Sequence, residues 1–329
     1  MPDGGPVLRD EKTSRAIAKE AVTKVYQHTA SIHPDKASPR EKELLEQRRL
    51  LALRFRKTYG SGDENGPTEA PHFIGVFDTV ASLANPVVVV GLGIIGAVAL
   101  VWFAWLLSFW WLAWAAWSGI LVGTAVVLCC YWYAKTHFKW PGALPGFSCW
   151  KTLTRTEMLM KFYDNRLSER VKYARHAISI DEDRKTFQRV SWGTRYLVKE
   201  PDEYGVNWFE QLWFAGNHSD VGGSYAENDA RLSDITLSWM LNAAKSAGLK
   251  HDPLYLHLYP DPAGPQHDER RKLVFRYAGV QLRNIVKDAT LHPSVEDRFK
   301  APAVLHYDEM KPYRPLALRH HEKVAHWYQ

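Results

Sequence analysis

Hydrophobic and polar positions divide the chain into one long uncharged stretch and flanking segments of mixed pattern. Residues 86–134, 49 in all, contain no Asp, Glu, Lys or Arg. One bilayer crossing needs about 20 apolar residues, so we expect two transmembrane helices, at about 87–107 and 111–133, joined by a tight turn near Ser108 and Phe109. Seven of the 14 Trp residues fall in this stretch, most of them around the turn, as an interfacial aromatic belt would place them. The alternative is a hydrophobic hairpin buried in a globular core.

The flanking segments alternate between helical and strand patterns. A capping box at residues 38–41, with Pro at the first helical position, predicts a helix that ends near Lys57. The short apolar runs 72–77 and 210–216 predict strands. A helical pattern from about residue 233 to 248 follows the second run. The order strand, loop, helix is typical of a doubly wound α/β sheet.

These patterns predict three segments. Residues 1–85 hold N-terminal helices and the strand that leads to Asp78, residues 86–134 form the inserted hairpin, and residues 135–329 form the remainder of the α/β domain.

Composition narrows the function classes. Lys and Arg number 42 against 36 Asp and Glu, a net charge of +6, but the basic residues are interspersed with acidic ones. This dispersal favours a mixed solvated surface over a nucleic-acid interface. Three cysteines cannot build a disulfide framework, which favours a reducing compartment. The N-terminus has no apolar core, so we expect no signal peptide.

Two residues that carry acid and base chemistry follow the two predicted strands directly. Asp78 comes after the first strand and His218 follows Asn217 after the second. Ligands of open α/β sheets bind beyond the carboxyl ends of the strands. An Asp that fixes the tautomer of a His base is the logic of serine hydrolases. A helix or turn cap at Asp78 and a structural histidine at His218 are the alternatives.

Three neighbours of His218 could support it. Asp220 competes with Asp78 as the group that orients the histidine, although an Asx turn before two glycines is the simpler interpretation. Gly222 and Gly223 allow either positive φ or a close approach of ligand to the backbone. The sequence does not separate these interpretations.

No metal or cofactor site is predicted. His320 and His321 lack partnering Cys or acidic ligands at a recognisable spacing. The glycines at 91, 93 and 96 lie in the apolar stretch, where small residues serve helix packing, and not in a phosphate-binding loop.

Four segments together resemble a known family. They are residues 73–80, 173–187, 213–225 and 291–298, and they are similar, in this order, to the bacterial α/β-hydrolase domain of formerly unknown function that includes type VI secretion phospholipase effectors. The resemblance implies a partial α/β-hydrolase-like doubly wound sheet and a Ser, Asp, His triad. It implies that Asp78 is the acid and His218 the base.

The family places its serine in a Gly-Phe-Ser-Arg-Gly elbow before the Asp-Thr motif, and nothing between Met1 and Asp78 matches that elbow. Ser61 lies in Gly-Ser-Gly without the spacing of an elbow, and Ser148 follows Asp78 and lacks the final glycine. Ser219 adjoins His218, and adjacent residues of an extended chain point to opposite sides. We therefore expect a chain that starts just downstream of the nucleophile.

The resulting hypothesis is the C-terminal part of a membrane-anchored lipase or phospholipase-type serine esterase, inactive by itself. The missing serine has three explanations: a truncated reading frame, a partner chain that carries the elbow, or a pseudoenzyme. The alternative function is a non-catalytic membrane scaffold or binding protein with a degenerate hydrolase fold.

Location and partners follow from the same features. Lys135, Lys139 and Lys151 follow the apolar stretch and its turn carries no Lys or Arg, so the positive-inside rule places both ends in the cytoplasm of a bacterial inner membrane. The expected partners are the lipid bilayer and an upstream chain that carries the nucleophile, with no nucleic acid. Export as an effector is left open by the sequence.

Overall fold

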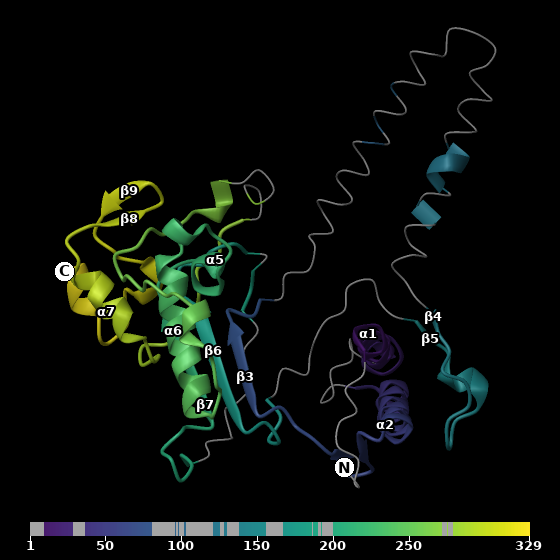
Figure 1. The fold of residues 1–329 in the computed structure, drawn as a ribbon. Coiled ribbons are helices and arrows are strands. Elements are labelled where there is room, and N and C mark those ends of the chain that lie inside the picture. The colour runs from purple at the N-terminus through teal and green to yellow at the C-terminus, as the bar shows by residue number, and fades with distance from the viewer. Residues whose placement is uncertain are drawn as a thin grey trace. The chain divides into compact units, whose positions relative to one another are not determined.

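The computed structural model divides the chain into two compact units, residues 1–69 with 84–165 and residues 70–83 with 166–329. Figure 1 shows the helices and strands of each. The structure describes residues 10–28, 37–80, 96, 98, 102, 121–125, 128–129, 138–155, 167–185, 187–189, 192, 200–271, 275 and 279–329.

The first unit contains a pair of helical segments whose ends follow local sequence signals. Helix α1 (Glu11–Glu20) begins at the cap Asp10 and continues into η1 (Ala21–Val25) and η2 (Tyr26–His28). Helix α2 (Pro39–Tyr59) begins at the capping box, as predicted, and ends at Gly60 in the left-handed conformation. His28 Nε2 lies 3.0 Å from Gln47 Oε1, which joins the two segments through a buried polar contact.

Short elements complete this unit. They are the antiparallel pair β1 (Gly62–Asp63) and β2 (Gly66–Pro67), the antiparallel pair β4 (Phe138–Lys139) and β5 (Thr154–Arg155), and the turn η4 (Cys149–Thr152).

The second unit is built on a parallel sheet of three strands in the order β3 (Phe73–Phe77), β6 (Tyr173–Ser179) and β7 (Phe209–Phe214). Every residue of the central strand β6 is buried, as expected where helices or loops cover both faces of a parallel sheet. Helix α5 (His218–Gly222) follows β7 almost directly, and α6 (Arg231–Ser246) comes next. The carboxyl ends of all three strands therefore lie at one edge, next to the start of α5.

Alternating side chains of the strands supply two cores on opposite faces of the sheet. Ile178 and Trp213 pack with Phe299 of helix α7 (Pro293–Lys300) and with the C-terminal segment. Their neighbours Ala177 and Phe214 pack on the other face with residues of α5 and α6. This period of two is the expected geometry of extended strands. The two cores hold the strand ends from both faces of the sheet.

The remaining elements of this unit are short. They are η5 (Glu227–Asp229), η6 (Pro253–Tyr255), η7 (Glu269–Arg271), the hairpin β8 (Val304–His306) and β9 (Glu309–Lys311), η8 (Leu316–Leu318) and η9 (Ala325–Tyr328).

The predicted fold class requires a correction. In the described part of the chain, no helix has the length and apolar character needed to cross a membrane. The doubly wound sheet with an inserted transmembrane hairpin is therefore wrong, and so is the inner-membrane location with two transmembrane helices. The observed class is mixed α/β with small sheets, and three strands make the largest sheet of the described residues.

The prediction rested on the absence of charge, on the clustered Trp residues and on the Lys residues that follow the stretch, and none of these requires a continuous helix. Most of residues 86–134 lie outside the described residues. The predicted three-segment division, with boundaries at 85 and 134, stays a prediction.

Candidate active site

Asp78 occupies the point where strand β3 ends. Its backbone has φ 38°, an uncommon value for a residue other than Gly, and its N–H donates to Ala177 O of the neighbouring strand at 2.7 Å. The residue is fully buried. A non-glycine residue with positive φ, held by a strand bond, is a strained position that the surrounding structure enforces.

Three donors converge on the Asp78 carboxylate. Ser179 N–H donates to Oδ1 at 3.0 Å, and Oδ2 accepts from His218 Nδ1 at 2.9 Å and from Arg283 Nη2 at 3.0 Å. Burial by itself raises the pKa of Asp78, but the hydrogen bond from His218, the charge of Arg283 and the bond from Ser179 outweigh burial and lower it. The carboxylate is therefore ionised at neutral pH.

His218 is presented by the first turn of α5. Asn217 caps this helix with its side-chain oxygen, and the Asn217 N–H donates to the Asp220 side chain. The two bonds together form a capping box. The His218 N–H donates to Glu182 Oε2 at 3.2 Å. The side chain of His218 is 31% exposed while that of Asp78 is 0% exposed. With Nδ1 directed at the ionised carboxylate, Nε2 is the nitrogen left to accept a proton.

A tight turn before α5 sets the position of the histidine. Gly216 has φ 110°, and a Cβ added there would lie 2.4 Å from Asp220 Cβ. The turn therefore needs glycine for both its backbone conformation and its space. Gly223 ends α5 with φ 82° and has no atom within 4 Å of an added Cβ, and Gly222 meets only Phe77 Cβ, at 3.8 Å.

The structure places Asp220 against another histidine and not against His218. His267 Nδ1 lies 2.7 Å from Asp220 Oδ1, and the His267 N–H donates to Oδ2 at 3.2 Å. The hydrogen bond to Asp220 raises the pKa of His267, and burial opposes it. The ring of Tyr225 stacks on His267 with the centroids 3.7 Å apart, and Tyr225 Oη donates to Glu269 Oε1 at 2.6 Å.

Sequence reasoning missed Arg283, Ser179 and His267. Arg283 lies 205 positions from Asp78 in a loop without periodic pattern, so no local signal identifies it. Ser179 lies at the end of β6, in one of the segments that carry the family resemblance. Ser179 bonds Asp78 Oδ1 through its backbone N–H, so its residue type carries no signal for this contact.

The three serines considered from sequence have the following places in the fold. Ser61 and Ser148 belong to the first compact unit, whereas Asp78 and His218 belong to the second. Ser148 precedes the turn η4 as its N-cap residue. Ser219 follows His218 in α5, and its N–H donates to the capping oxygen of Asn217 at 2.7 Å.

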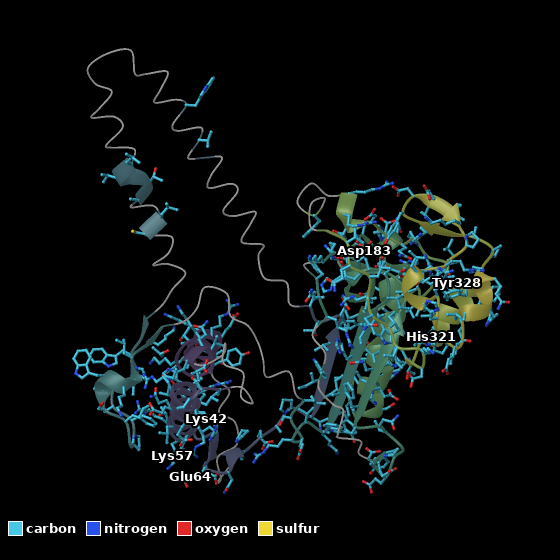
Figure 2. The ribbon with its side chains drawn as sticks, turned by 180° about the vertical axis from the view of Figure 1, so that it is seen from behind. Lys42, Lys57, Glu64, Asp183, His321 and Tyr328 are labelled. Atoms are coloured by element: carbon cyan, nitrogen blue, oxygen red, sulfur yellow. The ribbon has the colours of Figure 1, made fainter. Side chains whose placement is uncertain are left out.

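Metal ligation finds no support among the described residues, where no group of three His, Cys, Asp or Glu side chains is placed to hold an ion. His321, labelled in Figure 2, is buried and its Nε2 lies 2.8 Å from Ala289 O, whereas its neighbour His320 is exposed. These contacts give His321 a structural role at the C-terminal side of the unit.

Comparison with known proteins confirms the resemblance. Residues 141–243 match the family model described as "T6SS, Phospholipase effector Tle1-like, catalytic domain". The matched region contains β6, β7 and His218, and it excludes Asp78 and Arg283. A 50-residue stretch is 46% identical to "Uncharacterized protein YEL023C" of Saccharomyces cerevisiae. This match covers 14% of this chain and 7% of the yeast protein. No solved structure matches the chain.

Proposed function

We propose that this chain supplies the acid and the base of a serine ester hydrolase of the lipase or phospholipase kind. One observation carries the proposal: the bond of 2.9 Å between His218 Nδ1 and the buried Asp78 carboxylate at the carboxyl ends of parallel strands. The match of residues 141–243 to a phospholipase catalytic domain supports the same reaction class.

In the proposed reaction, Asp78 keeps the proton of His218 on Nδ1 and stabilises the imidazolium that forms. His218 Nε2 accepts the proton of a serine hydroxyl as the serine oxygen attacks the ester carbonyl carbon. The imidazolium then protonates the leaving alcohol, and water, deprotonated by the same nitrogen, releases the fatty acid. Arg283 keeps Asp78 ionised in its buried position through each step.

The nucleophile is the part that these 329 residues do not contain in the form of a Gly-Phe-Ser-Arg-Gly elbow. We propose that a segment or partner chain with that elbow completes the site, and that lipids of a bilayer are the substrate. Absence of the elbow favours a second function, a non-catalytic binding protein that retains the hydrolase fold.

The two functions differ in a complementation experiment. The chain is assayed for release of fatty acid from dihexanoyl phosphatidylcholine, alone and with a segment carrying the Gly-Phe-Ser-Arg-Gly elbow, fused or added as a second chain. We expect no hydrolysis and no fluorophosphonate labelling by the chain alone. With the elbow supplied, we expect hydrolysis that His218→Ala lowers by about 10³-fold or more, because a triad without its base loses most of its activity.

Two outcomes would contradict the proposal. Hydrolysis that persists in His218→Ala would remove the base from the reaction. Labelling of the chain alone that is lost in Ser148→Ala would show a nucleophile within the chain. If no elbow-bearing segment restores hydrolysis although the complex forms, the binding function is favoured.

A further inference from the structure

A cavity of about 250 Å³ is lined by Trp213 and by residues of the segments 182–184, 187–189 and 281–284. Asp78 is not in its lining, but Arg283, which is, bonds the Asp78 carboxylate. Arginines from all three segments line it: Arg184, Arg189 and Arg283. At ~30 Å³ per water the cavity has room for about eight water molecules, which is ample for a tetrahedral anion. The lining residues all belong to the second compact unit.

Arg283 lines this cavity and has two nitrogens without a hydrogen-bond acceptor among the described residues. Its side chain is 6% exposed, and of its three nitrogens only Nη2 is bonded, to Asp78 Oδ2 at 3.0 Å and to Ser179 Oγ at 3.4 Å. Nε and Nη1 are buried and have no partner in the part of the chain that the structure describes. A buried donor without an acceptor is unfavourable, so a ligand that reached these nitrogens and accepted their hydrogen bonds would stabilise Arg283.

Arg189 adds a positive charge that no carboxylate within the described residues balances by a direct ion pair. Its guanidinium lies over the ring of Trp213, 5.3 Å from the centroid. Burial and the nearby charge of Arg283 both lower the pKa of Arg189, whereas Asp78 raises it. Two guanidinium groups that repel each other around one cavity are stabilised by an anion between them.

The third arginine is already neutralised. Arg184 donates from Nε and Nη2 to Glu182, both at 2.7 Å, and its guanidinium stacks on the ring of Phe187, 3.5 Å from the centroid. Glu182 is therefore not free to neutralise Arg189. Three guanidinium groups face two carboxylates, those of Asp78 and Glu182, which leaves an excess of one positive charge.

We propose that this cavity, the Arg189–Arg283 pocket, binds a phosphate group, and that in the reaction it holds the phosphate of a phospholipid whose ester lies at His218. Arginine forks match the oxygens of phosphate in charge and geometry. The placement suits the base because His218 Nδ1 and Arg283 Nη2 bind the same oxygen of Asp78, at 2.9 and 3.0 Å. Phosphate binding stands on the pocket alone, whereas the lipid as its source rests on the proposed function.

The first test measures binding of inorganic phosphate to the full chain by calorimetry, with no nucleophile required. We expect saturable binding that Arg189→Gln weakens at least about tenfold, since a charge-assisted hydrogen bond contributes ~1.5–3 kcal/mol. Arg319→Gln is the matched control, because Arg319 is an exposed arginine outside the pocket and its loss changes the net charge equally. The proposal is overturned if the wild-type chain shows no saturable binding or if the two variants bind alike.

A second measurement guards against a folding defect in Arg189→Gln. Phosphate is expected to raise the Tm of the wild-type chain and of Arg319→Gln, because a ligand that binds only the folded state stabilises it. The Tm of Arg189→Gln is expected to rise less than that of the wild type at the same phosphate concentration. A phosphate-dependent increase equal to that of the wild type would contradict the pocket.

Competition identifies the source of the phosphate group. Dihexanoyl phosphatidylcholine, a phosphodiester, is expected to displace inorganic phosphate, and dihexanoylglycerol, which lacks the phosphate, is expected to leave it bound. If the phosphodiester fails to compete, the lipid source is wrong and the pocket is one for free phosphate. Failure of the proposed hydrolysis with phosphate binding intact would instead remove the ester chemistry and leave the pocket.

Discussion

The molecule contains two histidine–carboxylate pairs that touch the same short helix, and they differ in what surrounds them. His218 bonds Asp78 at 2.9 Å and His267 bonds Asp220 at 2.7 Å, and both carboxylates are buried. The histidine side chains are similarly exposed, at 31% and 26%. Distance and exposure therefore do not tell a catalytic pair from a structural one.

The surroundings of the two carboxylates do separate the pairs. Asp78 has Arg283 as a permanent counter-ion, so its ionisation does not require a protonated histidine. Asp220 makes no direct ion pair with an arginine in the described part of the chain, and its bond raises the pKa of His267. A base must stay neutral until it accepts a proton. This requirement disfavours His267, whose pKa is raised, and stacking by Tyr225 favours a structural role for it.

The largest expected difference in stability is between substitutions of the two carboxylates, Asp78 and Asp220. Asp78→Asn removes the counter-ion of the buried Arg283 and is expected to lower the free energy of unfolding by about 3–5 kcal/mol, the usual effect of breaking a buried ion pair. Asp220→Asn keeps an acceptor oxygen and leaves no buried arginine unpaired, so we expect about 1–2 kcal/mol. Urea denaturation at pH 7 measures both. Equal losses would contradict the distinct role of Arg283.

The next largest expected loss of stability comes from a substitution in the turn that positions α5. Gly216→Ala forces a side chain into a backbone at φ 110° and against Asp220 Cβ, and we expect a loss of roughly 2–3 kcal/mol. Gly223→Ala is the control, because Gly223 has φ 82° and ψ 173° with no described atom within 4 Å of an added Cβ, so its cost of about 1–2 kcal/mol is that of the backbone conformation alone. Thermal unfolding compares them. If Gly216→Ala costs no more than Gly223→Ala, the close approach to Asp220 does not constrain the turn.

The smallest effect is a pH dependence that belongs to His267. Because its pKa is raised in the folded state, its bond to Asp220 stabilises the chain fully below the unfolded pKa of about 6.5. That stability is lost as the pH rises through the folded value. The difference in unfolding free energy between the wild type and His267→Gln is therefore expected to shrink from pH 6 to pH 9. A difference that grows over this range would reverse the assigned direction.

How far the sequence predicts this site depends on how local each signal is. Asp78 and His218 follow apolar strands, and parallel strands end at one edge of a sheet, so their meeting could be expected. The capping box of α2 could also be read directly. Arg283 and His267 lie in loops far along the chain from the carboxylates they contact. Their positions depend on tertiary packing, which no periodic pattern records.

The predicted transmembrane hairpin is a case in which a strong sequence signal gave a wrong prediction. Absence of charge over residues 86–134 is a strong compositional signal, yet it shows only that such a segment is compatible with an apolar environment. A membrane span also requires a continuous helix of sufficient length, and the described residues contain none. The composition of a segment therefore constrains its structure less than backbone hydrogen bonding constrains the register of paired strands.

The most direct measurement of the central claim uses an activated ester that needs no serine. Imidazole nitrogen can attack p-nitrophenyl acetate, release p-nitrophenolate, and lose the acetyl group to water. We expect the wild-type chain and His267→Ala to hydrolyse this ester at the same rate, and His218→Ala to lose most of it. If His218→Ala retains the rate of the wild type, or if His267→Ala loses it instead, the assignment of His218 as the displayed base is contradicted.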